Sequence, residues 1–162
     1  MPIVDARALS YQQMVAFIKK QPVQIQSDEA IVPHDTVKII SITDPDVPKL
    51  FFEEVGKVIT FNYRDIEATC EPEKYTPSPE HMTQEDAGKI VDFIQEVHAL
   101  PARVLLLVNC MFGQARSGAI VDYTGNVCGL GYWNTRKRNP QIVPNHWNQF
   151  LLFQEFFKRK MK

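Results

Sequence analysis

The chain has 162 residues, of which 44% are hydrophobic and 23% charged, and this predicts one soluble globular domain over residues 1–162 with a single core. Its formal net charge of -1 lacks the basic excess on which nucleic-acid binding depends, so we expect no nucleic-acid partner. No apolar run reaches the roughly 18 residues that a membrane span needs, and we expect no membrane partner.

The first half of the chain contains one predicted helix and two predicted strands. Apolar residues at helical spacing indicate a short amphipathic helix over residues 7–20. Runs rich in β-branched residues indicate strands at 37–42 and 57–62, and the first ends at the turn sequence Thr43-Asp44-Pro45-Asp46. Residues 63–82 hold three prolines and are predicted to form a surface loop, and loops of this length inside compact domains are often functional.

The second half alternates helices with a strand. Thr83 followed by Asp86 is a variant of the capping box and predicts that a helix begins at residue 84 and continues to 98. Residues 104–108 are apolar at every position, as expected for a central strand covered on both faces. A helix is predicted from Ser117 to about Cys128, because Gly129 follows as an end signal.

The last part of the chain is predicted to contain a polar, solvated loop at 132–146 and a final helix over 145–160, whose aromatic residues we assign to the core. The alternative is that this loop borders the site and contacts substrate through Arg136 or Arg138. Strands that alternate with helices indicate an α/β fold. We therefore expect a short, mostly parallel central sheet that is flanked by helices on both faces.

The three cysteines, Cys70, Cys110 and Cys128, are odd in number and do not have the spacing of metal ligands. This pattern predicts neither a disulfide scaffold nor a metal site, and we expect no cofactor. Reduced thiols, together with a beginning that lacks the pattern of a signal peptide, predict a cytoplasmic protein. Cys70 or Cys128 could form a reversible disulfide with Cys110, but we expect both to be inert thiols.

The stretch NCMFGQARSG at 109–118 places a cysteine where the apolar strand gives way to a turn, with an arginine six residues later. A loop that wraps a phosphate needs several inward backbone N–H groups, and Gly113 permits the unusual dihedrals that this requires. A helix that begins at Ser117 would turn its positive end to the anion, and Arg116 would add a bidentate fork. The same field favours a thiolate at Cys110.

The alternative is that Cys110 is a small buried residue at a strand end, as most cysteines are. With this composition, a Cys-x5-Arg pair that also has the glycine and the following serine arises in about 2 of 10,000 shuffled sequences. The pattern therefore favours a phosphate-binding loop.

NCMFGQARSG resembles the active-site signature of the protein tyrosine phosphatase superfamily in its short, dual-specificity-like form, His-Cys-x5-Arg-Ser/Thr. The landmarks SITDPD, FNYRDIE and IVDFI precede it in an order similar to that of small phosphatase-like proteins of bacteria and their phages. The resemblance covers roughly residues 37–130. It implies a sheet flanked by helices, a phosphocysteine intermediate, no metal and no cofactor.

The resemblance also implies a role for each residue of the signature. Cys110 would attack phosphorus, Arg116 would bind the equatorial oxygens, and the Ser117 hydroxyl would stabilise the thiolate when the intermediate is hydrolysed. The backbone amides that hold the phosphate would come from Met111, Phe112, Gly113, Gln114 and Ala115. The usual histidine before the cysteine is Asn109, which can orient the loop by hydrogen bonds but cannot be cationic. Phe112, where a small residue is common, could narrow the loop.

A general acid would protonate the leaving group, and this step is typically worth about 10²- to 10⁴-fold. Asp65 is the best candidate, because it lies just beyond the predicted strand at 57–62, where the family keeps its acid. Asp44 and Asp46 are rivals, although an aspartate before proline is a common turn former. Asp65 could instead be an exposed carboxylate paired with Arg64.

The sequence thus predicts a metal-independent cysteine phosphatase that acts on phosphotyrosine or with dual specificity. Its partner would be a phosphorylated protein or a small phosphomonoester. The alternative is a phosphate- or phosphoprotein-binding module on the same fold, in which Asn109 has impaired catalysis. An RNA 5′-phosphatase is disfavoured by the near-neutral charge.

Overall fold

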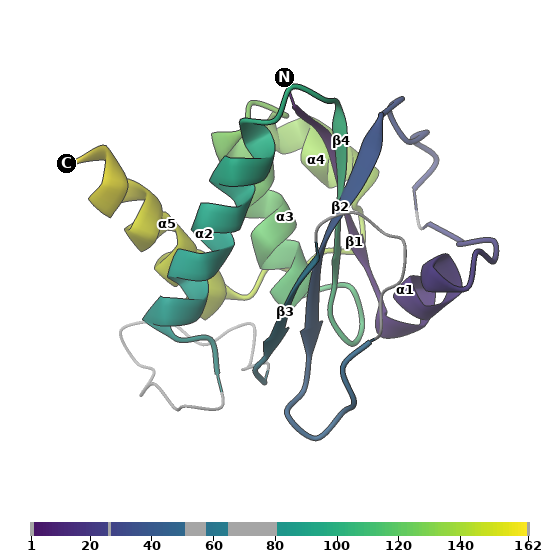
Figure 1. Cartoon of the computed structure of the whole chain (residues 1–162), viewed down its shortest axis with the longest axis horizontal. Helices are drawn as coiled ribbons and strands as arrows, with labels where there is room; N and C mark the ends of the chain where they lie inside the picture. The colour runs from purple at the N-terminus through teal and green to yellow at the C-terminus, as the bar shows by residue number, and fades with distance from the viewer. Residues whose placement is uncertain (1, 26, 51–57, 65–80, 162) are drawn as a thin grey trace.

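The structure is a computed structural model that describes residues 2–25, 27–50, 58–64 and 81–161 (Figure 1). In the described residues, strands and helices are interspersed up to the last strand, and the chain beyond it forms helices alone. The strands are β1 (Ile3–Leu9), β2 (Thr36–Thr43), β3 (Val58–Asn62) and β4 (Val104–Asn109), and the helices are α1 (Tyr11–Ile18), α2 (Gln84–His98), α3 (Arg116–Val127), α4 (Tyr132–Arg138) and α5 (His146–Lys160).

The described strands form one sheet in the order β1-β4-β2-β3, and all neighbouring pairs are parallel. In this register Asn109 at the end of β4 lies beside Leu9 of β1 and Ser41 of β2. The carboxyl ends of the strands therefore meet at one edge of the sheet. In open parallel sheets that edge is where ligands bind.

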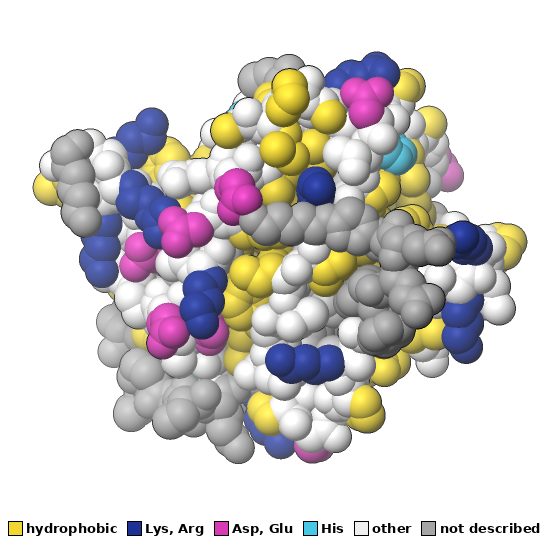
Figure 2. Space-filling model, viewed as in Figure 1, with side chains coloured by type: hydrophobic (Ala, Val, Ile, Leu, Met, Phe, Trp, Pro, Cys, Tyr) yellow, Lys and Arg dark blue, Asp and Glu magenta, His cyan; other side chains and the backbone are white. Residues whose placement is uncertain are grey.

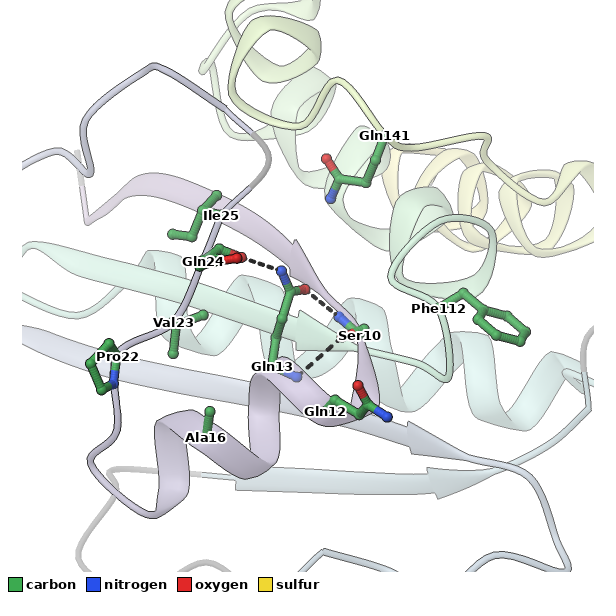
Figure 3. A pocket seen from close by; sticks show the side chains of 10 residues that line it. All are labelled: Ser10, Gln12, Gln13, Ala16, Pro22, Val23, Gln24, Ile25, Phe112 and Gln141. Carbon is green, nitrogen blue, oxygen red and sulfur yellow. Dashed lines mark hydrogen bonds between the residues drawn. The ribbon is translucent and has the colours of Figure 1, made fainter.

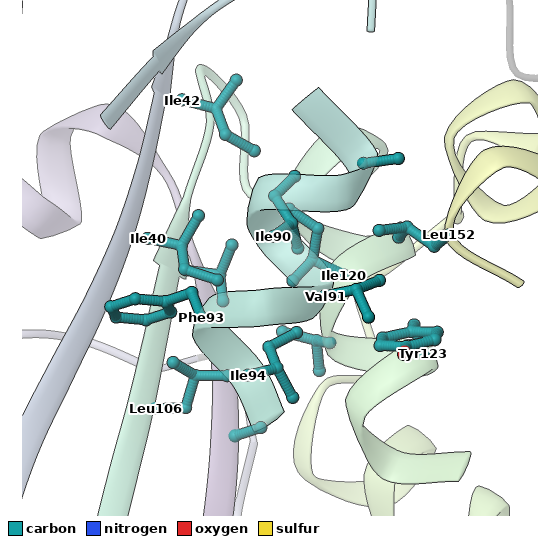
Figure 4. Close-up of a cluster of buried hydrophobic side chains, with 14 of the residues drawn as sticks. Ile40, Ile42, Ile90, Val91, Phe93, Ile94, Leu106, Ile120, Tyr123 and Leu152 are labelled. Atoms are coloured by element: carbon teal, nitrogen blue, oxygen red, sulfur yellow. The ribbon is translucent and has the colours of Figure 1, made fainter. Parts of the chain in front are cut away.

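Helices cover both faces of the sheet, so the predicted α/β class is confirmed. On one face Met14 of α1 packs among side chains of β1, β2 and β4: Leu9, Ile39, Leu105 and Leu107. On the other face α2, α3 and α5 enclose the larger cluster, part of which Figure 4 shows: Ile40, Ile42, Ile90, Val91, Ile94, Leu106, Ile120, Tyr123 and Leu152. Because β4 is covered on both sides, each of its residues is buried, as its unbroken apolar sequence predicts.

Helix α2 begins and ends where its sequence predicts. The Asp86 N–H donates to the Thr83 hydroxyl at 3.1 Å and the Thr83 N–H donates to the Asp86 carboxylate at 3.0 Å. These two bonds form the predicted capping box and satisfy two N–H groups that a helix start leaves open. Figure 2 shows acidic and basic side chains intermixed over α2 and α5, where Arg159 pairs with Asp92.

The helix predicted over residues 7–20 is wrong in its first part, since β1 continues to Leu9 and α1 begins only at Tyr11. The strand is not recognisable in the sequence, because the charged residues Asp5 and Arg7 interrupt its apolar pattern. Inside the protein they neutralise each other: the Arg7 Nε donates to the Asp5 carboxylate at 3.1 Å, and both side chains are fully buried. A buried charge is tolerated when it is paired in this way.

The predicted loop at 132–146 is also corrected, because residues 132–138 form α4. This short helix is fixed by a tertiary contact rather than by its own sequence: the Asn139 amide donates to the Ala6 carbonyl and accepts from the Ala8 N–H of β1. Of the aromatic residues of α5 that we assigned to the core, Trp147 is buried, whereas Phe150 and Phe157 are exposed, which corrects that assignment. None of the described helices has both the length and the apolar content to cross a membrane.

Candidate functional site

The loop from Cys110 to Ala115 joins the central strand β4 to α3, and Figure 1 shows it as a rounded turn between these two elements. Cys110 is the first residue beyond the strand, and its N–H donates to the Leu9 carbonyl at 3.2 Å. The side chain of Cys110 is buried. The cysteine is therefore at the carboxyl edge of the sheet, and its position is fixed by the neighbouring strand.

Neighbouring segments fix the position of the loop through hydrogen bonds to its backbone carbonyl oxygens. These oxygens accept hydrogen bonds from the start of α1 and from the connection between α4 and α5. The bonds are Tyr11 N to Met111 O, Val143 N to Gln114 O and Asn145 N to Ala115 O, each at 3.0 Å, and Gln141 Nε2 to Gly113 O at 3.4 Å. Four carbonyls of the loop are thus engaged by the protein.

The N–H groups of the loop have no such partners. Within the part of the chain that the structure describes, no N–H from residue 111 to residue 118 donates a hydrogen bond. Successive backbone N–H groups that remain free are the donors of an anion-binding nest, and the last of them belong to the first turn of α3, where the helix dipole also favours an anion. The loop can therefore donate several hydrogen bonds to one oxyanion.

Gly113 is needed for the loop to close. Its φ is +71°, and a Cβ at this position would lie 2.7 Å from the carbonyl carbon of Leu9 and 2.7 Å from the nitrogen of Ser10. Both obstacles are backbone atoms, which cannot move aside as a side-chain end can. The prediction that Gly113 supplies unusual dihedrals is confirmed, and the absence of a Cβ also lets the loop lie against the junction between β1 and α1.

Cys110 and Ser117 are brought together across the loop. The Cys110 sulfur and the Ser117 hydroxyl oxygen lie 3.1 Å apart and share a hydrogen bond. Both residues are buried, so this bond is shielded from bulk water. A hydroxyl in this position can donate to a sulfur that carries negative charge.

Arg116 is buried at the start of α3, and one edge of its guanidinium is anchored. Nη1 donates to the Asp44 carboxylate at 2.6 Å and to the Tyr63 carbonyl at 2.8 Å. Nε is buried and has no hydrogen-bond partner. Because Nη1 is already held, the edge formed by Nε and Nη2 remains available for the two-pronged contact that guanidinium makes with a phosphate.

The candidate acids fall into three different situations. Asp44 is paired with Arg116, which suits a carboxylate that positions a cation more than one that gives up a proton. Asp46 is largely exposed and pairs with Arg64 at 3.4 Å. Asp65 lies outside the described residues, two positions after Tyr63, whose carbonyl binds Arg116.

Asn109 ends β4 and is fully buried, with 0% of its surface exposed. Neither the oxygen nor the nitrogen of its side-chain amide has a hydrogen-bond partner. The expected hydrogen bond from Asn109 to the loop backbone is therefore not formed. An unpaired buried amide is costly, on the order of 1–3 kcal/mol.

Phe112 does not narrow the loop from inside, because its side chain is 77% exposed. Cys128 is a contrasting thiol: it is packed in the larger core cluster, and burial raises its pKa to about 12, so it stays protonated. Cys110 and Cys128 are both free thiols, and Cys70 lies outside the described residues. Among the described side chains no group of three or more His, Cys, Asp or Glu could hold a metal ion.

Two parts of the site were not predicted from the sequence. The ion pair between Asp44 and Arg116 spans 72 positions, and its only signal in the sequence is the polar turn TDPD at a strand end. The contacts from Gln141, Val143 and Asn145 come from a segment that we predicted to be a solvated loop, and no local pattern marks them.

Comparisons with known proteins find likenesses among solved structures but not among families or curated proteins. No family model matches the chain, and no curated protein matches it. Among solved structures, the crystal structure of a human tyrosine phosphatase-like serine/threonine/tyrosine-interacting protein is 19% identical, with a TM-score of 0.49, over 78% of this chain and 80% of that chain. The function therefore has to be inferred from the residues of the loop itself.

Proposed function

We propose that this protein is a metal-independent, cysteine-dependent phosphatase that acts on phosphotyrosine or with dual specificity. The observation that carries the proposal is the combination around one loop: unpaired N–H groups over residues 111–118, an anchored Arg116 with a free edge, and a sulfur that is hydrogen-bonded to Ser117. The resemblance of the sequence signature to that of cysteine phosphatases supports the same reaction.

In the first step the Cys110 thiolate attacks phosphorus, so that an S–P bond forms while the bond from phosphorus to the leaving oxygen breaks. The loop N–H groups and the Nε–Nη2 edge of Arg116 donate to the three equatorial oxygens, where negative charge is concentrated in the transition state. Asp65 is the proposed proton donor to the leaving oxygen, with Asp44 and Asp46 as its rivals. No cofactor takes part in this step.

In the second step water attacks phosphorus and gives a proton to the carboxylate that protonated the leaving oxygen, while the S–P bond breaks and inorganic phosphate leaves. The electrons of that bond return to the Cys110 sulfur, which lies 3.1 Å from the Ser117 oxygen. A hydroxyl donor at this distance stabilises the departing thiolate. Ser117 therefore acts in the hydrolysis of the intermediate, after Cys110 and Arg116 have formed it.

The second candidate function is phosphate or phosphoprotein binding without turnover. The observation that favours it is Asn109, which cannot carry the positive charge of a histidine and whose side-chain amide has no hydrogen-bond partner. Calorimetry separates the two functions, since a binding module takes up a phosphopeptide and releases no phosphate. Release of phosphate from an aryl phosphate by the wild-type protein selects the enzyme.

Asn109→His is expected to raise kcat/KM for p-nitrophenyl phosphate about tenfold at pH 6. A positive charge on the residue before Cys110 is expected to favour the thiolate, which is the form of the thiol that attacks phosphorus. Initial rates of nitrophenol release across pH 5–8 measure this.

Asn109→Leu is the matched control for that substitution, because it removes the unpaired amide at similar volume without adding charge. We expect it to raise the melting temperature while leaving the rate low. Equal rates for the histidine and leucine variants would show that charge at position 109 does not limit the reaction.

A further inference from the structure

We propose that the hollow beside the loop binds the uncharged residues that flank a phosphorylated residue in an extended peptide. The inference rests on the proposed function and names its substrate class, which is phosphoprotein rather than small phosphomonoester. The hollow has a volume of about 560 Å³, and Figure 3 shows it between α1, the segment that follows α1, and the loop.

The hollow and the loop share their walls. Phe112 belongs to the loop and also lines the hollow, and Ser10 lies against the loop backbone near Gly113. Gln141 ties the two together from the opposite side, because its amide nitrogen donates to Ala8 O and to Gly113 O. The hollow is therefore the neighbouring space that the proposal assigns to residues beside a phosphate held by the loop.

The polar lining of the hollow consists of uncharged groups. The side-chain amides of Gln12 and Gln24 are exposed and make no hydrogen bond to the described part of the chain, and the Gln141 Oε1 is buried without a partner. Gln13 by contrast is already used, since its amide accepts from the Ser10 N–H at 2.7 Å and donates to the Gln24 carbonyl. A carboxamide offers the same donors and acceptors as a peptide group, so the free amides match a peptide backbone.

The rest of the lining is apolar. Ala16, Pro22, Val23 and Ile25 line the side opposite Phe112, whose ring is exposed at the edge toward the loop. The volume lies within the range of about 300–1,000 Å³ in which pockets bury most of a drug-sized ligand. Because none of the lining residues is charged, a nucleotide or a polyphosphorylated sugar would bring further charges that find no partner there, whereas a neutral peptide would not.

The test compares the affinity of two kinds of non-hydrolysable probe for the wild-type protein by calorimetry. One is a difluoromethyl phosphonate analogue of phosphotyrosine or phosphoserine inside a peptide with Ser, Gln and Val flanks; the other is the same phosphonate side chain alone. We expect the better peptide to bind about tenfold more tightly than its own side chain, which is the gain that one or two hydrogen bonds and some apolar contact provide. Aspartate flanks are expected to remove this gain.

Two variants and a control locate the gain. The first variant is the double substitution Gln12→Ala with Gln24→Ala, which removes the free amides. The second is Ala16→Phe, which fills the hollow. Each is expected to bring the ratio of peptide affinity to side-chain affinity close to one. Gln154→Ala on α5 replaces a glutamine away from the hollow and is expected to keep the ratio. Thermal melts of all variants verify that they are folded.

The binding measurements distinguish a failure of this inference from a failure of the proposed function. If the phosphonate side chain binds but the peptide gains nothing, or if the gain survives Ala16→Phe, the hollow does not hold the flanking residues. If neither probe binds the wild-type protein, both proposals fall.

Discussion

Replacing Cys110 with serine is expected to lower kcat for p-nitrophenyl phosphate by at least about 10³-fold. The serine hydroxyl can occupy the place of the sulfur and keep the hydrogen bond to Ser117, but it is a far weaker nucleophile at neutral pH. Phosphate binding is expected to persist, because the loop N–H groups and Arg116 are unchanged. Phosphate release and the affinity for vanadate, measured on the same preparation, separate the two effects.

Cys128→Ser is the matched control, because the same substitution is made at another buried thiol. Burial raises the pKa of Cys128 to about 12, so this thiol carries no charge at neutral pH and cannot attack phosphorus. We expect the rate of the folded protein to be unchanged. If the wild-type rate equals that of Cys110→Ser at every pH, the protein is not a cysteine phosphatase. If Cys128→Ser alone loses the rate, Cys128 and not Cys110 is the nucleophile.

Arg116→Ala is expected to lower kcat/KM by about 10³-fold. The substitution removes the bidentate contact and also the positive charge that stabilises the negatively charged transition state. Arg116→Lys is expected to recover only a small part of this loss. Lysine keeps a positive charge but lacks the planar fork, and its single nitrogen cannot bind Asp44 and the phosphate in the same geometry. Rates for a series of aryl phosphates measure both variants.

Asp44 is expected to act through Arg116, since its carboxylate holds Nη1 at 2.6 Å. Asp44→Ala is expected to lower kcat/KM about 10- to 100-fold by misplacing the guanidinium, and Asp44→Asn, which retains an acceptor oxygen for Nη1, is expected to lose less. The double variant with Arg116→Ala is expected to be no slower than Arg116→Ala alone, which is the mark of residues that act as a unit. Additive losses would show instead that Asp44 has a separate role, such as that of the general acid.

Most of the fold follows from local patterns. Helix α2 forms where the Thr83 cap and the amphipathic spacing predict it, and β4 forms where the unbroken apolar run predicts it. In both elements the local sequence pattern and the tertiary packing favour the same structure. The two errors in secondary structure arise where tertiary contacts override the local pattern. Strand β1 contains two charged residues that are tolerated in the core because they pair with each other, and α4 is fixed by hydrogen bonds between Asn139 and a strand more than 130 positions away.

The site is predictable to the same extent. The signature itself predicts the positions of Cys110, Gly113, Arg116 and Ser117, since their spacing along the chain determines how a short loop can close. The partner of Arg116 could not be predicted, because Asp44 reaches it only when β2 and β4 pair side by side. The same holds for Gln141, whose bonds to Ala8 and Gly113 depend on how the connection before α5 lies against the loop.

The central claim is that the segment from Cys110 to Arg116 encloses a phosphoryl group, and a crystal structure of the wild-type protein grown with orthovanadate tests it most directly. We expect vanadium bonded to the Cys110 sulfur, equatorial oxygens that accept hydrogen bonds from the N–H groups of residues 111–116, and a bidentate contact from Nε and Nη2 of Arg116. Vanadate bound elsewhere, with the loop N–H groups turned away from the sulfur and Arg116 directed to solvent, would contradict both the enzymatic and the binding function.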